Sequence, residues 1–129
     1  MVGMRITIFT KSTSDVPAEI VESMNPKTAK AIIDALPIRG RGNRWGDETY
    51  FSIGVKVGSE SAKQVVEKGD LAYWPPGEAL CIFFGPTPAS RGDEPRAASP
   101  VNVFGKVLGD PRVFRKVRSG EEVIISKAE

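Results

Sequence analysis

The stretch that most constrains the fold is residues 69–90, GDLAYWPPGEALCIFFGPTPAS. Two apolar runs, residues 71–74 and 79–84, are separated by the turn-forming letters PPGE, and the letters GPTP follow the second run. Apolar runs of about four to eight residues bounded by glycine and proline are typical of buried strands, because proline has no N–H to donate to a neighbouring strand. The stretch therefore predicts a central β-hairpin. Aromatic residues stand where its two strands end: Tyr73, Trp74, Phe83 and Phe84.

Further strands are expected where apolar residues alternate with polar ones or form short bounded runs. The clearest is residues 48–57, in which every second position from Thr49 onward is apolar or β-branched. Glu48 and Tyr50 fall on the opposite face of that strand, because successive side chains of a strand point to opposite sides. The remaining strands are expected at residues 4–10, 18–22, 101–107 and 122–126.

Two segments begin with Asn-Pro or Asp-Pro, which is typical of a helix start. Asparagine and aspartate cap helices well, and proline fits the first turn because its missing N–H would be unpaired there. Helices are therefore expected at residues 26–36 and 110–117, and a shorter one at residues 59–68. The four prolines and two glycines of residues 85–100 predict a long irregular loop, and such loops in compact domains are usually functional.

These segments together predict a mainly β fold in a single domain over residues 1–129. A chain of this length can bury one hydrophobic core but not two. The compact arrangement that best accommodates many strands and two short helices is a closed antiparallel β-barrel of about eight strands.

Composition argues against several classes of function. The chain contains no histidine, which rules out catalytic triads with an imidazole base and argues against a zinc, iron or copper site. We therefore expect no metal and no cofactor. Eighteen basic and 16 acidic residues give a net charge of +2, so the chain has no broad positive field for nucleic acid or an anionic membrane.

The single cysteine, Cys81, cannot form an internal disulfide, which is typical of a reducing compartment. Its place in a buried strand indicates a structural thiol. Residues 1–10 lack the basic start and the cleavage site of a signal peptide, and no apolar stretch is long enough to span a bilayer. We therefore expect a cytoplasmic location.

Two stretches resemble the ends of a cyclophilin. Residues 18–36, AEIVESMNPKTAKAIIDAL, are similar to a strand and helix of that family, and residues 102–126 resemble its Phe-Gly-Lys-Val strand, second helix and last strand. Phe83 and Phe84 are similar to the paired phenylalanines of the family's active-site strand. Three segments resemble compact archaeal and bacterial cyclophilin-like proteins of unassigned activity: WGDETYF at 45–51, GDLAYWPPGEALCIFFGPTP at 69–88 and ASPVNVFG at 98–105.

The resemblance implies a cyclophilin-like barrel and, as an activity, peptidyl-prolyl cis-trans isomerisation. An isomerase needs an apolar slot for the proline ring and a cationic donor that weakens the resonance of the amide bond. Candidates for the two roles come from different parts of the chain. Tyr50, Trp74 and Phe84 could line the slot, and Arg44 or Arg96 could be the catalytic donor.

The sequence also departs from the family. Aligning the Phe-Gly-Lys-Val strands places Val101 where cyclophilins carry a histidine of their site, and residues 96–100 where they carry a tryptophan. No arginine of this chain stands in a copy of the family's catalytic motif. The resemblance therefore implies weak or absent isomerase activity.

The interpretation we favour is a ligand-binding pocket on the side of the barrel. If the barrel closes as in cyclophilins, polar residues at strand ends converge with aromatic residues of neighbouring strands. A mostly apolar hollow with a few oriented polar groups is the usual form of a small-molecule or peptide site. The residues expected to bind are Glu48, Tyr50, Tyr73, Trp74, Phe84, Thr87, Ser90, Ser99 and Asn102.

Three functions remain open from the sequence. The first is binding of a small molecule or a proline-containing peptide, the second is prolyl isomerisation, and the third is a structural or interaction role without a ligand. Neither nucleic acid nor a membrane is expected as a partner, and the sequence leaves the oligomeric state open.

Overall fold

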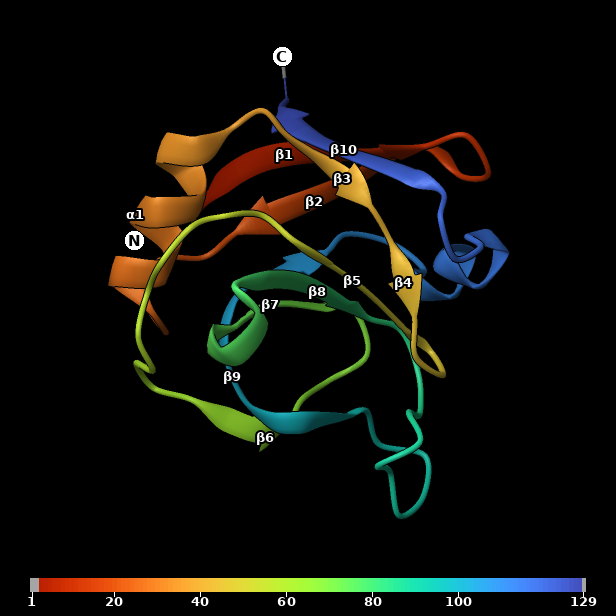
Figure 1. Cartoon of the computed structure of the whole chain (residues 1–129). Coiled ribbons are helices and arrows are strands. Elements are labelled where there is room, and N and C mark those ends of the chain that lie inside the picture. The colour runs from red at the N-terminus through yellow and green to blue at the C-terminus, as the bar shows by residue number, and fades with distance from the viewer. Residues whose placement is uncertain (1–2, 129) are drawn as a thin grey trace.

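The computed structural model describes residues 3–128 and arranges ten strands in one antiparallel sheet (Figure 1). The strands are β1 (Met4–Thr10), β2 (Ser14–Ile20), β3 (Ile38–Arg41), β4 (Asn43–Arg44), β5 (Glu48–Ser52), β6 (Lys63–Val65), β7 (Asp70–Trp74), β8 (Ala79–Phe83), β9 (Arg96–Val107) and β10 (Glu122–Lys127). Their order is β3-β10-β1-β2-β9-β7-β8-β5-β4, and β6 pairs with β9 outside this path. The mainly β fold is confirmed, with more strands than the eight or so expected.

The predicted central hairpin is formed by β7 and β8. Leu71 pairs with Ile82 and Trp74 pairs with Ala79. A 3₁₀ turn, Pro75–Gly77, joins the two strands, and Glu78 after it adopts a left-handed conformation. The hairpin confirms that bounded apolar runs marked buried strands here.

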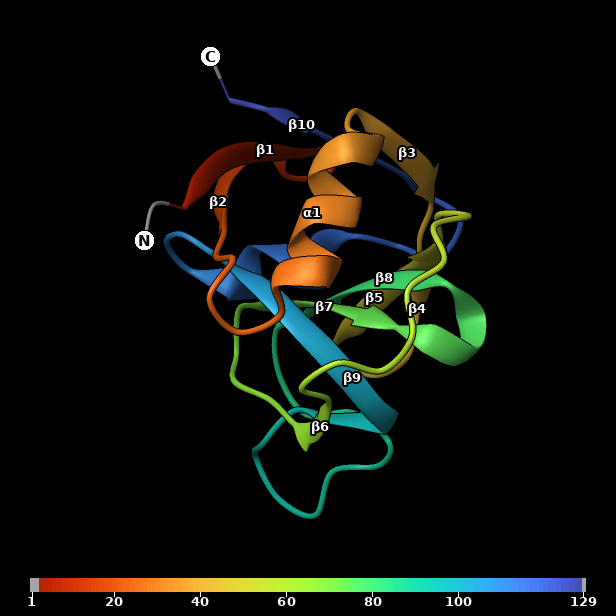
Figure 2. The same cartoon turned by 90° about the vertical axis from the view of Figure 1, so that its left-hand side faces the viewer.

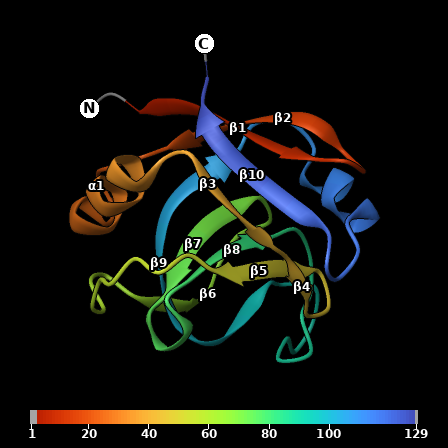
Figure 3. The same cartoon turned by 45° about the horizontal axis from the view of Figure 1, so that its top comes forward.

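The sheet curls around a core, so that β1, β2, β3 and β10 face β5, β7 and β8 across it (Figures 1 and 3). The closed barrel expected from the sequence is not confirmed, because the described ladder runs from β3 to β4 and does not join its two ends. Gly42 alone separates these strands along the chain. The Phe51 and Thr49 side chains of β5 lie directly against the backbone of this segment. A Cβ added to Gly40 would lie 2.5 Å from Phe51, and one added to Gly42 would lie 2.6 Å from Thr49.

Helix α1 (Pro26–Ala35) confirms the helix expected at 26–36 and covers one end of the curled sheet (Figure 2). It buries Ala29 and Ile32. The capping role expected for Asn25 is wrong: its side chain makes no cap bond and instead donates to the Val103 carbonyl over 2.7 Å. Within residues 3–128, no helix is long and apolar enough to cross a membrane.

The helix expected at 110–117 is a 3₁₀ helix, Pro111–Lys116. Asp110 caps it as expected, because its carboxylate accepts from the Arg112 backbone N–H over 3.0 Å. That carboxylate also binds the Arg112 side chain, which lowers its pKa to about 2.

Four other expectations about elements differ from the structure in bounds or type. The strand expected at 48–57 is β5, which ends at Ser52. The strand expected at 18–22 is β2, which begins at Ser14 because it pairs along the whole of β1. Residues 59–68 contain the strand β6 and not a helix, because the edge of β9 offers them partners. The irregular loop expected at 85–100 ends at Arg96, where β9 begins.

Two hydrophobic clusters use the two faces of the same strands. The main cluster lies inside the curl and includes Leu71, Tyr73 and Phe51. A smaller second cluster lies on the outer face of β5, β7 and β8 beneath β6 and the first half of β9. Its buried members are Val66, Ala72, Cys81, Phe83, Ala97, Val101 and Val103, and Tyr50 and Trp74 pack against them.

Candidate ligand pocket

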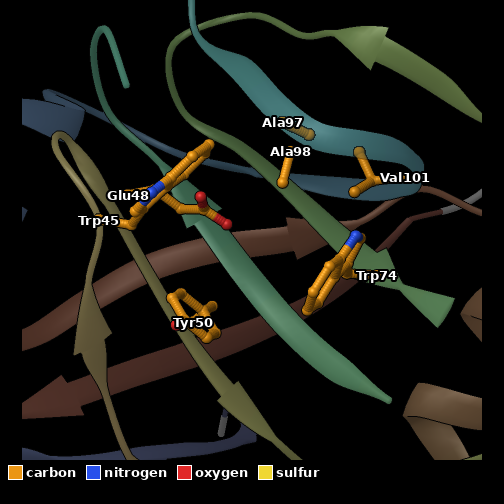
Figure 4. A pocket seen from close by; sticks show the side chains of 7 residues that line it. All are labelled: Trp45, Glu48, Tyr50, Trp74, Ala97, Ala98 and Val101. Carbon is orange, nitrogen blue, oxygen red and sulfur yellow. The ribbon is translucent and has the colours of Figure 1, made fainter. Parts of the chain in front are cut away.

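A pocket of about 240 Å³ opens at the edge of the second cluster (Figure 4). Strand register brings its walls together: Tyr50 of β5 pairs with Cys81 of β8, which also pairs with Ala72 of β7. Side chains two residues along from these pairs share the same face. The lining residues are Trp45, Glu48, Tyr50, Trp74, Ala97, Ala98 and Val101.

Glu48 supplies the charged group of the pocket. It is only 5% exposed, and its carboxylate points into the space between the three aromatic side chains (Figure 4). Burial raises its pKa to about 7, and a hydrogen bond from the Cys81 thiol offsets part of that rise. Within residues 3–128, no lysine or arginine lies at ion-pair distance from Glu48.

Tyr50 and Trp74 form two walls that meet at a corner. Their ring centroids lie 6.4 Å apart, with an angle of 71° between the ring planes. The indole N–H of Trp74 donates to the Ser99 hydroxyl over 2.7 Å. Ser99 therefore holds the Trp74 ring in place but does not line the pocket.

Trp45 is a third aromatic wall, and sequence reasoning did not place it at the site. It lies in the turn between β4 and β5, directly after Arg44. Its backbone N–H donates to the Glu48 carbonyl over 2.9 Å, and this turn returns the Trp45 ring over the strand that carries Glu48. A signal for it is present in the sequence: Trp45 stands three positions before Glu48, whose side chain is predicted to point away from the core.

Tyr73 and Phe84 lie away from the pocket, in the main cluster. Tyr73 and Trp74 are neighbours on one strand, so they must point to opposite faces, and Tyr73 takes the inner one. Its hydroxyl donates to the Val55 carbonyl over 2.5 Å. Phe84 is buried beside Phe114, with ring centroids 6.2 Å apart.

Thr87, Ser90 and Asn102 also lie outside the pocket lining. The Thr87 hydroxyl donates to the Arg96 carbonyl over 2.5 Å, and the Ser90 hydroxyl donates to the Glu94 carbonyl. These bonds tie the 85–95 loop to the start of β9 and to itself. Asn102 is fully buried under helix α1, where it binds Thr28 over 3.0 Å.

The two arginines considered as catalytic donors are engaged elsewhere. Arg44 donates to the carbonyls of Gly46 and Val117 over 2.9 Å each, and its guanidinium carbon lies 5.0 Å from the centre of the Phe84 ring. Arg96 donates to the Glu94 carboxylate over 3.1 Å. Neither arginine lines the pocket.

A second hollow, of about 510 Å³, lies beside the start of β10. Its lining is Phe9, Lys11, Arg41, Gly120, Glu121 and Glu122. Arg41 donates there to the Gly120 carbonyl over 3.0 Å, and Glu121 accepts from the Ser12 backbone N–H over 2.8 Å. These polar groups already have partners within the fold, so the hollow presents a solvated surface.

Comparisons with known proteins agree with this architecture. The sequence matches the family described as Cyclophilin-like over residues 4–126. The solution structure of the hypothetical protein AF2241 from Archaeoglobus fulgidus is similar, with 45% sequence identity and a TM-score of 0.82. The similarity covers 98% of this chain and 96% of the archaeal one. Comparison with curated proteins finds no match. The chain therefore belongs to the cyclophilin-like family.

Proposed function

We propose that this cyclophilin-like domain binds a small molecule in the pocket around Glu48. The observation that supports the proposal is a buried carboxyl group without a cationic partner among the described residues, surrounded by the rings of Trp45, Tyr50 and Trp74. Burying a carboxyl group costs free energy, and no ion pair among the described residues offsets that cost here. A mostly apolar hollow with one oriented polar group is the usual form of a ligand site.

The size of the pocket favours a small ligand. Its volume of about 240 Å³ is below the range of roughly 300 to 1,000 Å³ that is typical of drug-sized ligands. A metabolite of a few heavy atoms, or one side chain of a peptide, would fill it. An extended stretch of proline-containing peptide would have to lie mostly outside.

Prolyl isomerisation receives less support from the geometry. The pocket lining offers a carboxyl group and no cationic donor, and a negative charge does not stabilise the lone pair on a twisted amide nitrogen. Arg44 and Arg96 both have other partners. A protease-coupled assay on proline peptides should therefore show little turnover, and turnover that is lost in Arg44→Ala or Arg96→Ala would reverse this order of hypotheses.

A fragment screen observed by ¹H–¹⁵N NMR tests the binding proposal. We expect shifts of the indole N–H signals of Trp45 and Trp74 with polar aromatic or aliphatic fragments at millimolar concentration. Ala98→Leu should abolish them, because Ala98 is an exposed residue of the pocket wall (Figure 4) and a larger side chain there would occupy the hollow.

Ala128→Leu is the matched control, because Ala128 is exposed and outside the pocket lining, and its backbone N–H donates to the Arg5 carbonyl over 3.1 Å. It should bind fragments like the wild type. A screen in which no fragment shifts either indole signal, or in which Ala98→Leu binds as well as the control, would leave the pocket without a ligand and favour an interaction role.

A further inference from the structure

We propose that the pocket selects an organic ammonium ion, an amine nitrogen that carries methyl groups or a short alkyl chain. The inference rests on the proposed function, because it names the chemical class of the ligand for the same pocket. Three features carry it: a buried carboxyl group without a cationic partner among the described residues, three aromatic walls and an otherwise aliphatic lining.

The first step is charge. Glu48 is the only acidic or basic residue in the lining, and the other members are aromatic or aliphatic. The nearest arginine along the chain, Arg44, faces main-chain carbonyls and Phe84 on the other side of the sheet. A cationic ligand would therefore meet one unopposed negative charge in a site of low dielectric, where the attraction is much larger than in water. An anionic ligand would be repelled.

The second step is the aromatic wall. The faces of Trp and Tyr rings carry negative electrostatic potential, and cations bind over them, especially when they are desolvated. Tyr50 and Trp74 stand at 71° to one another, so a group in their corner contacts both rings. The Trp74 N–H is already bonded to Ser99, so the indole offers the pocket its ring and not its donor.

The third step is the aliphatic part of the lining. Ala97, Ala98 and Val101 of β9 provide methyl groups across the pocket from Tyr50 (Figure 4). A bare ammonium or metal ion would lose its hydration there without replacement oxygens. Alkyl groups on nitrogen spread the charge and match this surface, which is why a methylated or alkylated amine fits better than a small inorganic cation.

The charge on Glu48 also sets how binding should vary with pH. The titratable neighbours of Glu48 are Cys81 of β8, whose thiol donates to its carboxylate, and Tyr50 of β5, which lines the same pocket. The β9 residues of the lining are all neutral. Burial raises the pKa of Cys81 well above its usual value, so the thiol stays protonated near neutral pH. A cation binds the deprotonated form of Glu48, whose pKa is about 7, so its affinity should rise as the pH rises through 7.

The experiment compares choline with 3,3-dimethylbutan-1-ol, its uncharged isostere, by NMR titration of the full chain. At pH 8 we expect choline to bind at least about tenfold more tightly than the isostere, as a desolvated cation–carboxylate contact predicts. Choline should bind about tenfold more weakly at pH 6 than at pH 8, because a carboxyl with a pKa of about 7 is about one-tenth deprotonated at pH 6 and about nine-tenths deprotonated at pH 8. The isostere should show no such pH dependence.

Two variants complete the test. Glu48→Gln should remove both the preference for choline and its pH dependence, while Glu122→Gln, a matched change of an exposed carboxylate that faces Arg39, should keep both. A second arm titrates a short peptide with a trimethylated lysine, which distinguishes a protein side chain from a free amine as the source of the ammonium group. Tighter binding of that peptide than of choline would identify a protein partner.

The outcomes separate the two proposals. Equal binding of choline and its isostere, or a choline affinity unchanged in Glu48→Gln and between pH 6 and 8, would overturn the ammonium inference and leave small-molecule binding standing. If choline does not bind but fragments still shift the Trp45 and Trp74 signals, the ammonium inference is again overturned and small-molecule binding still stands. If choline does not bind and no fragment shifts the Trp45 and Trp74 signals, both proposals are rejected.

Discussion

The side chain of Glu48 is the least favourable placement of a charge in the described fold. The pKa of this carboxyl rises from its usual value of 4.5 to about 7 on folding. The folded chain therefore binds the proton of Glu48 more tightly than the unfolded chain does. The stability that this proton contributes to the folded state is fully present below about pH 4.5 and is lost as the pH rises through 7. The size of that loss is about 3 kcal/mol.

Glu48→Gln should remove this pH dependence, because glutamine has nearly the same shape and no titration. We expect the difference in unfolding free energy between the variant and the wild type to shift by about 3 kcal/mol in favour of the variant between pH 4.5 and pH 8. Urea denaturation across that range measures it. The pKa of Glu94 is lowered from 4.5 to about 2 by bonds that include the Arg91 backbone N–H. Its titration therefore changes the free energy of unfolding in the opposite direction, and only below about pH 4.5. A difference that stays flat with pH would mean that Glu48 is solvated.

Much of the pocket follows from side-chain period alone. Glu48, Tyr50 and Trp74 were predicted at one face, and the structure brings all three to one pocket. Tyr73 was assigned to the same place because it stands at the end of the same strand, but its neighbour Trp74 takes the outer face. Trp45 was missed because no period extends into the turn before β5, where backbone bonds set the direction of the ring.

At the scale of elements, buried asparagines hold helix α1 and the segment after β5 to β9. Asn102 donates to Thr28 over 3.0 Å and to the Gly58 carbonyl over 2.9 Å, and it accepts from the Glu60 backbone N–H over 3.0 Å. Glu60 in turn accepts from the Thr28 backbone N–H at the start of α1 over 3.1 Å. These bonds do for α1 what a capping residue usually does.

Asn102→Ala should therefore destabilise the fold by about 2 to 4 kcal/mol, because it removes three hydrogen bonds made by one fully buried side chain. Asn43→Ala is the matched control: Asn43 is exposed and makes one long bond, 3.3 Å, to the Tyr50 carbonyl. Its effect should be within about 0.5 kcal/mol. Thermal denaturation followed by circular dichroism compares the two, and a similar small loss in both would show that the network carries no stability.

Elements with strong local signals were predicted well. The hairpin of β7 and β8 has proline at its turn, and α1 has its proline start, so both appear within a residue or two of their expected bounds. The segment 59–68 was predicted wrongly because its local helical pattern is weak. Its conformation is set by β9, a partner more than thirty residues away along the chain, which no local pattern reports.

At the scale of the whole molecule, β9 connects the two parts of the sheet. It pairs with β2 along residues 105–107, with β7 along residues 102–106, and with β6 at Arg96 and Val101. Gly105 allows the closest approach: a Cβ there would lie 2.3 Å from the Glu19 carbonyl oxygen and 3.2 Å from the Ile20 Cα. Both obstacles are backbone atoms, which cannot rotate away.

Gly105→Ala should therefore destabilise the fold by about 3 kcal/mol or more, since overpacking against a rigid ladder forces strands apart. Gly58→Ala is the matched control, because no atom lies within 4 Å of a Cβ at that position. The free energies of unfolding in guanidinium chloride would differ clearly between the two variants. Equal values would mean that β2 and β9 can separate locally at no cost.

The two faces of β5, β7 and β8 carry different residues for different tasks. The inner face packs the main cluster, and the outer face holds the smaller cluster and the pocket. Under the proposed function, selection for ligand recognition and selection for folding would act on alternate residues of the same strands. A lineage could exchange residues 45, 48, 50 and 74 for a new ligand while residues 49, 51, 71 and 73 stay fixed, so that descendants share a fold and differ in what they recognise.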